Sequence, residues 1–157
     1  MPRMYTVSVE NVAITNANGD ADLVELSAAD DRPIELVGIG LYSLTEVGEA
    51  QEEWLRCAVV RGNTTSGNGT AATPRPCDPG DPAASFAAET YGSTLASTGT
   101  AVTLHPFGWP VRAGYEIFYP EHCGFKTTQA DGFLVVRMLA GPADDLNADL
   151  CFWVLEG

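Results

Sequence analysis

Two histidines are the first residues of this chain to test for chemistry, because imidazole is the commonest metal ligand and general base. His105 precedes a proline and His122 precedes a cysteine, so the paired spacing of a metal centre is missing. We interpret both as loop or edge residues bonded to nearby backbone. No Gly-x-Ser-x-Gly turn marks a nucleophilic serine either. The sequence therefore predicts no metal and no cofactor.

Four cysteines also occur, without CxxC or CxH spacing, so a zinc cluster is not predicted. Cys57 and Cys151 lie in apolar runs and are expected to be small buried side chains. Cys77 and Cys123 lie near prolines and glycines, which makes them the better disulfide candidates. Four cysteines allow three pairings, and the sequence does not choose between them.

Neighbouring carboxylates are the remaining chemical signal, at Asp30-Asp31, Glu52-Glu53 and Asp144-Asp145. Adjacent residues of a strand point to opposite faces, so these pairs are expected to be solvated turn charges. The oxygen-rich segment from Asn16 to Asp22 lacks the twelfth-position glutamate of a calcium loop. We predict no enzyme, and keep as an alternative a hydrolase with an unmarked carboxylate site such as Glu53 or Glu121.

Composition indicates one folded domain over residues 1–157. Hydrophobic residues make up 45% and charged residues 18% of the chain, which excludes a disordered protein. The formal charge of −13 makes nucleic acid and anionic membrane unlikely partners, because phosphate would be repelled. With no signal-peptide or membrane-spanning run, the protein is expected to be made in the cytoplasm and to stay soluble.

Hydrophobic alternation predicts about eight strands, little helix and long loops, which fits a jelly-roll-like antiparallel β-sandwich. A phase change near Glu10 and Asn11 predicts a β-bulge in the first strand. The expected strands are Met4–Ile14, Leu23–Ser27, Pro33–Leu44, Trp54–Arg61, Val102–Trp109, Tyr115–Tyr119, Phe133–Leu139 and Leu146–Leu155.

The segments between the expected strands also contain patterns that predict local structure. Asn18-Gly19 between apolar runs predicts a hairpin turn. Glu46–Glu53 could form one helical turn, and Asp81-Pro82 could begin a brief helix reaching about Ala88. Residues 62–82 form a loop rich in glycine and proline, which favours a contact arm over a lid because no catalytic pattern accompanies it.

The last strand is apolar on one complete face, and its second face becomes apolar at Cys151, Trp153 and Leu155. That second face should be covered by a loop or by another copy of the chain. Aromatic residues also gather from Phe107 to Tyr119, where they could stack on sugars or form core and subunit contacts.

Several stretches resemble a family of small, mostly uncharacterised proteins encoded in tailed-phage and prophage genomes: MYTVSVENVAIT, EEWLRCAVVRGNTTSGNGTAATPRP with FAAET, RAGY, and DGFLVVRMLAGPADDL. The likeness spans nearly the whole chain, although the cysteines depart from the family pattern. It implies a phage protein, and small acidic β-sandwiches of this kind are often capsid decoration, or cement, proteins. The resemblance implies a homotrimer bound to the major capsid protein on the virion surface.

The residues expected to contact the capsid or a sister subunit come from the long loop and from the aromatic segments. They are Thr64, Asn68, Thr73, Arg75, Pro76, Phe107, Trp109 and Trp153. A carbohydrate-binding module of a phage fibre or tail is the alternative that the ring cluster from Phe107 to Tyr119 suggests.

Overall fold

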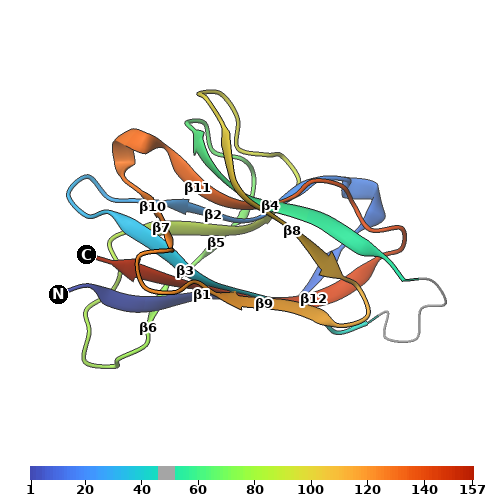
Figure 1. The fold of residues 1–157 in the computed structure, drawn as a ribbon, viewed down its shortest axis with the longest axis horizontal. Helices are drawn as coiled ribbons and strands as arrows, with labels where there is room; N and C mark the ends of the chain where they lie inside the picture. Colours follow the sequence, from blue (N-terminus) through green and yellow to red (C-terminus); the bar gives the residue numbers. More distant parts are fainter. Residues whose placement is uncertain (46–51) are drawn as a thin grey trace.

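A computed structural model describes residues 1–45 and 52–157 and shows two six-stranded antiparallel sheets packed face to face (Figure 1). The predicted all-β sandwich is confirmed. Sheet A has the order β10-β3-β12-β1-β6, with β9 also paired to β3, and sheet B has the order β5-β7-β2-β11-β4-β8. The strands are β1 (Arg3–Ile14), β2 (Ala21–Ser27), β3 (Ile34–Ser43), β4 (Trp54–Asn63), β5 (Thr70–Ala72), β6 (Arg75–Pro76), β7 (Ala87–Gly92), β8 (Val102–Pro110), β9 (Gly114–Phe118), β10 (Phe125–Thr127), β11 (Phe133–Met138) and β12 (Leu146–Glu156).

Eight of these strands follow jelly-roll topology. Along these eight strands the chain changes sheet at every step except from β4 to β8. As a result, β1, β12, β3 and β9 lie side by side in sheet A, while β2, β11, β4 and β8 lie side by side in sheet B. The predicted Asn-Gly hairpin is therefore wrong, because β1 and β2 belong to different sheets. Asn16–Asn18 instead forms a 3-10 turn that ends at Gly19 with φ of 65°.

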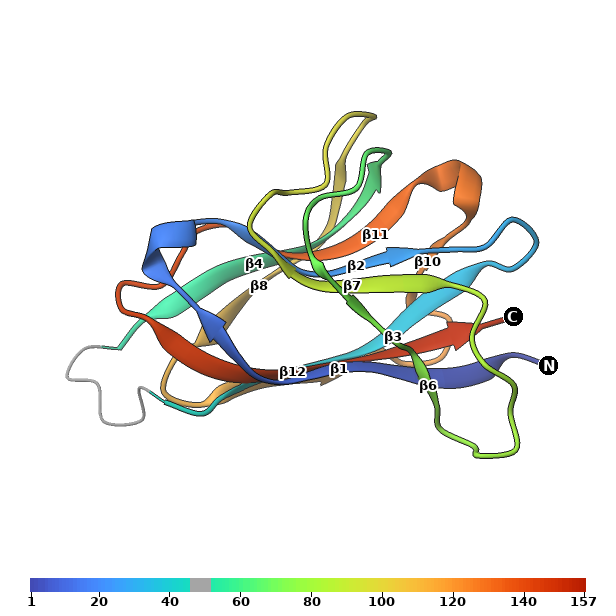
Figure 2. The same ribbon diagram turned by 180° about the vertical axis from the view of Figure 1, so that it is seen from behind.

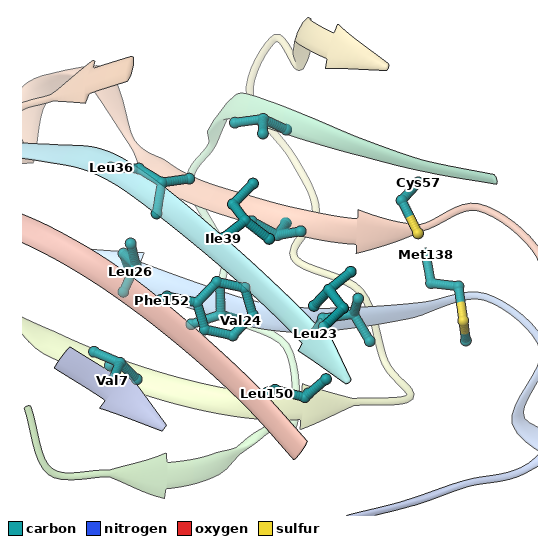
Figure 3. Close-up of a cluster of buried hydrophobic side chains, with 14 of the residues drawn as sticks. Val7, Leu23, Val24, Leu26, Leu36, Ile39, Cys57, Met138, Leu150 and Phe152 are labelled. Carbon is teal, nitrogen blue, oxygen red and sulfur yellow. The ribbon is translucent and has the colours of Figure 1, made fainter. Parts of the chain in front are cut away.

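Side chains from both sheets fill the core (Figure 3). Every second residue of β12 is buried, as the alternation predicted: Leu146, Ala148, Leu150, Phe152 and Val154 are each at most 1% exposed. From sheet B, Leu23 and Leu26 meet this row in the same cluster. The hydrophobic face of each strand thus determines which side of its sheet points inward.

The predicted bulge in β1 is confirmed. The pairing of β1 with β12 shifts between Val9 and Val12, and Asn11 has φ of 50°. Asparagine tolerates this left-handed conformation better than most residues, which explains why the irregularity falls there.

The middle of residues 62–82 is held to the domain by two short strands. β5 pairs with β7 at the edge of sheet B, and β6 pairs with Tyr5 and Thr6 of β1 at the edge of sheet A. The segment thus crosses one side of the sandwich from sheet to sheet (Figure 2). These two short strands pair with backbone groups of β7 and β1 that would otherwise be unpaired at the edges of the sheets.

The short helix expected over Asp81–Ala88 does not form. The N–H groups of Ser85 and Phe86 donate to the Glu156 carboxylate, and residues 87–92 form strand β7 beside β2. Sheet pairing therefore outweighs the local capping signal. The helical turn expected over Glu46–Glu53 falls largely on residues 46–51, outside the described residues.

Candidate docking face on sheet A

Two aromatic rings meet on the outer face of sheet A. Cross-strand pairing places Trp153 of β12 and Phe118 of β9 on either side of Gly38 in β3. The ring centroids are 4.6 Å apart with an interplanar angle of 55°. A Cβ atom at position 38 would lie 2.7 Å from Phe118 and 3.0 Å from Trp153, so glycine lets both rings lie close to the sheet.

An apolar groove lies beside these rings. It has a volume of about 470 Å³, and its apolar lining includes Pro2, Met4, Val37, Phe118 and Leu155. Phe118 is 53% exposed, whereas Met4, Trp153 and Leu155 are half-buried. The apolar half of sheet A is defined here as Pro2, Met4, Val37, Phe118, Trp153 and Leu155.

Polar and charged groups border this groove. Lys126 Nζ lies 3.5 Å from Glu35 Oε2, and Glu121 Oε1 lies 3.5 Å from His122 Nε2 on the exposed turn after β9. All four residues contribute to the groove lining. An apolar centre with a charged, solvated rim is the usual arrangement of a protein–protein interface.

The other half of the same face is polar. The Tyr42 hydroxyl lies over Gly40 and donates to Glu116 Oε2, and this hydrogen bond is the main reason that the pKa of Tyr42 rises to about 12. Asn11 N–H donates to Asp149 Oδ1 at 2.8 Å. The outer face is therefore divided between an apolar end near the chain termini and an acidic end near the β-bulge.

Of the contact residues predicted from the sequence, Trp153 and Arg75 come together on this face. Both are ladder neighbours of Thr6, so they lie in one row across sheet A. Pro76 pairs with Tyr5 in the next row, and Thr73 is exposed just before β6. Arg75 thus lies at the β6 edge of sheet A, and Trp153 lies on the interior strand β12, with β1 between them.

Thr64 and Asn68 lie elsewhere, on the sheet B side. The Thr64 hydroxyl is 2.8 Å from that of Thr98, and Asn68 Oδ1 accepts the Thr94 N–H at 2.8 Å. These side chains hold residues 64–68 against residues 93–98.

Trp109 is fully buried, and this burial removes it from the contact surface that the sequence predicts. Phe107 stacks on Tyr115, with ring centroids 4.3 Å apart. His105 Nδ1 is 2.6 Å from the Tyr119 hydroxyl, so its partner is a side chain and not the expected backbone group. Burial raises the pKa of Tyr119. These half-buried rings pack against one another.

The residues with catalytic potential are dispersed. Glu53 accepts the Ala143 N–H through both carboxylate oxygens, at 3.0 and 3.1 Å, whereas the Glu121 side chain is 90% exposed. Throughout residues 1–45 and 52–157, no three His, Cys, Asp or Glu side chains gather as a metal site.

The sequence did not predict that Glu25 and Glu89 face each other across β2 and β7, because that pairing depends on strand register.

All four cysteines are free, including the two disulfide candidates Cys77 and Cys123, which are exposed. Cys57 is buried as expected, and burial raises its pKa to about 12. Cys151 is half-buried, and its pKa is raised by burial first and then by Cys77 and Glu116.

Comparisons of the chain with protein-family models, curated proteins and solved structures give no match. Within the described parts of the chain, no helix has the length and apolar character needed to span a membrane.

Proposed function

We propose that this chain is a non-enzymatic decoration protein of a phage head, which binds the major capsid protein and stabilises the shell. The observation that carries the proposal is the apolar half of sheet A, where Phe118 and Trp153 meet beside an apolar groove. The resemblance of MYTVSVENVAIT and DGFLVVRMLAGPADDL to phage-encoded proteins supports the proposed location.

Leaving this apolar surface in water costs free energy. Apolar surface gains about 25 cal/mol for each Å² that is buried, and aromatic residues dominate the energetics of interfaces. Phe118 is more than half exposed in the isolated chain, although a ring of its size would gain from burial. Contact with a second protein surface would cover Phe118, the partly accessible Trp153 and the groove together.

A homotrimer is part of the proposal, because three linked copies would bind a repeating shell more tightly than one. Each bound copy raises the effective concentration of the others at neighbouring sites, so modest single-site affinity is sufficient. Arg75 lies at the β6 edge of sheet A and could therefore contact a sister subunit.

The test compares two aromatic residues of similar exposure on opposite sheets. Phe118 of sheet A is 53% exposed, and Trp54 of sheet B is 59% exposed. We expect Phe118→Asp to weaken binding to heads purified without this protein by about tenfold or more, because it places a charge in the apolar contact. Trp54→Asp is the matched control and should bind as the wild type does.

Binding is measured by cosedimentation of the purified chain with the heads, and circular dichroism checks that each variant is folded. If both variants bind as the wild type does, sheet A is not the docking face. If the wild type itself fails to bind, the decoration role is refuted.

A further inference from the structure

Two glutamates face each other on the side of sheet B that points away from the core. Glu25 of β2 and Glu89 of β7 are direct ladder partners, so their side chains leave the sheet on the same face. The Ser66 hydroxyl is 3.4 Å from Glu89 Oε2, and the Gly67 N–H donates to Glu25 Oε2 at 3.0 Å. Both carboxylates line a pocket of about 210 Å³, which shares no residue with the groove on sheet A.

Glu25 is a buried carboxylate without a countercharge. It is 6% exposed, and its ladder neighbours are Glu89 on one side and Val135 of β11 on the other. In the described part of the chain, neither glutamate takes part in an ion pair. Asp22 on the same strand, by contrast, is paired with Arg137 at 2.6 Å. Buried carboxylates are usually paired with a cationic side chain or bound to a metal, so Glu25 lacks the partner that its burial calls for.

One oxygen of Glu25 is available to a ligand. The Gly67 N–H occupies Oε2, whereas Oε1 accepts no hydrogen bond from the described residues. Oε1 is not fully enclosed either. The side-chain atoms of the described chain that are both enclosed and unpaired are Ser43 Oγ, Trp109 Nε1 and Glu156 Oε2. Glu25 Oε1 is therefore an unpaired oxygen that can be reached from the pocket.

The pocket lining determines the charge of the ligand. The residues that join the two glutamates there are neutral: Ser27, Ser66, Ala87, Ala88 and Phe133. A bound cation would replace the repulsion between the two carboxylates with attraction to both of them. The Ser66 oxygen adds a neutral ligand, because a hydroxyl keeps lone pairs for accepting. Carboxylate, hydroxyl and water oxygens are the ligands of hard divalent cations.

We propose that this pocket binds one Ca²⁺ ion between Glu25 and Glu89. Glu25 Oε1 and the Glu89 carboxylate supply the charged ligands, Ser66 Oγ supplies a neutral one, and water completes the shell. Mg²⁺ requires near-octahedral geometry, whereas Ca²⁺ accepts the irregular arrangement of a half-buried and an exposed side chain over a buried one. With two carboxylates, the dissociation constant should lie at about 10⁻⁴–10⁻³ M. The ion would tie residue 66 to β2 and β7, so its binding should stabilise the fold.

Calorimetric titration of the untagged chain with CaCl₂ measures the affinity, and thermal unfolding followed by circular dichroism measures the stabilisation. NaCl at equal ionic strength is the reference, because a chain with a formal charge of −13 gains stability from screening alone. At a Ca²⁺ concentration about ten times the dissociation constant, the melting temperature should exceed the NaCl reference by about 4 °C. MgCl₂ should have a smaller effect.

Three variants locate the ion. Glu89→Gln removes one charged ligand and should weaken Ca²⁺ binding about tenfold or more, although in chelator it should be at least as stable as the wild type because the repulsion is lost. Glu25→Gln, whose amide oxygen can still accept the Gly67 N–H, should weaken binding likewise. Glu121→Gln is the matched control, since that side chain is 90% exposed and lies outside the pocket, and it should respond as the wild type does.

The proposal is overturned if CaCl₂ raises the melting temperature no more than NaCl does, or if Mg²⁺ has the larger effect. Unchanged Ca²⁺ affinity in Glu89→Gln or in Glu25→Gln would also overturn it. None of these measurements involves phage heads, so this proposal and the decoration role fail separately.

Discussion

Replacement of Arg137 should show that residues 93–101 are held to sheet B by a buried ion pair. Arg137 Nε lies 2.6 Å from Asp22 Oδ1, and its Nη2 donates to the Ala96 carbonyl at 3.0 Å. Ala96 N–H in turn donates to Asp22 Oδ2 at 2.7 Å. The side chains of Arg137 and Asp22 are 12% and 3% exposed.

The expected loss in the free energy of unfolding follows from this burial. Arg137→Met keeps an unbranched chain but leaves the Asp22 carboxylate buried without its countercharge, which costs about 3–5 kcal/mol. A domain of this size has about 5–15 kcal/mol of stability, so this single change would remove a large part of it. With a urea m-value of about 2 kcal/mol/M, the unfolding midpoint should fall by about 2 M.

Equilibrium urea denaturation, followed by tryptophan fluorescence, measures the effect. Arg75→Met is the matched control, because Arg75 is exposed, and it should change stability by no more than about 0.5 kcal/mol. The double variant Asp22→Leu with Arg137→Met should recover part of the loss, since it removes both charges but leaves the Ala96 N–H and carbonyl without their partners. A cost below about 1 kcal/mol for Arg137→Met would refute the reasoning.

Three further predictions concern thiol reactivity, alkaline titration and charge repulsion. Burial raises the pKa of Cys57 to about 12, so this thiol should resist a disulfide reagent at pH 8 until the chain unfolds, and rapid labelling found by peptide mass spectrometry would contradict its burial. The pKa of Tyr42 is raised from 10.0 to about 12, so the contribution of this hydroxyl to the free energy of unfolding should be constant below pH 10 and fall as pH rises from 10 to 12. In the variant Glu116→Leu, ultraviolet titration should show Tyr42 ionising nearer 10. Glu89→Gln should stabilise the fold by about 0.5 kcal/mol, because Glu89 directly opposes Glu25, and a lower melting temperature would argue against repulsion between them.

The long strands could be predicted from the sequence because their signals are local. Alternation along β12 identified its buried face, and the phase change near Asn11 located the bulge of β1. β5, β6 and β10 contain only two or three residues, too few for an alternating pattern. β7 consists of residues 87–92, AAETYG, and its strand state depends on pairing with β2.

The docking face was predicted only in part. Trp153 stood out because its strand becomes apolar on both faces, but Phe118 and Gly38 lie on other strands whose register the sequence does not reveal. The sequence also placed Trp109 wrongly on the contact surface, because a tryptophan in an aromatic segment can face either the core or the solvent. The hydrogen bonds that Glu156 accepts from the N–H groups of Ser85 and Phe86 join residues that are distant in the chain and carry no motif.

A density map of the phage head carrying this protein tests the central claim most directly. The account predicts that the protein lies on the outer surface of the shell, with Phe118 and Trp153 of sheet A covered by the major capsid protein. A map in which sheet A faces solvent, or in which the protein is absent from the head, would contradict it.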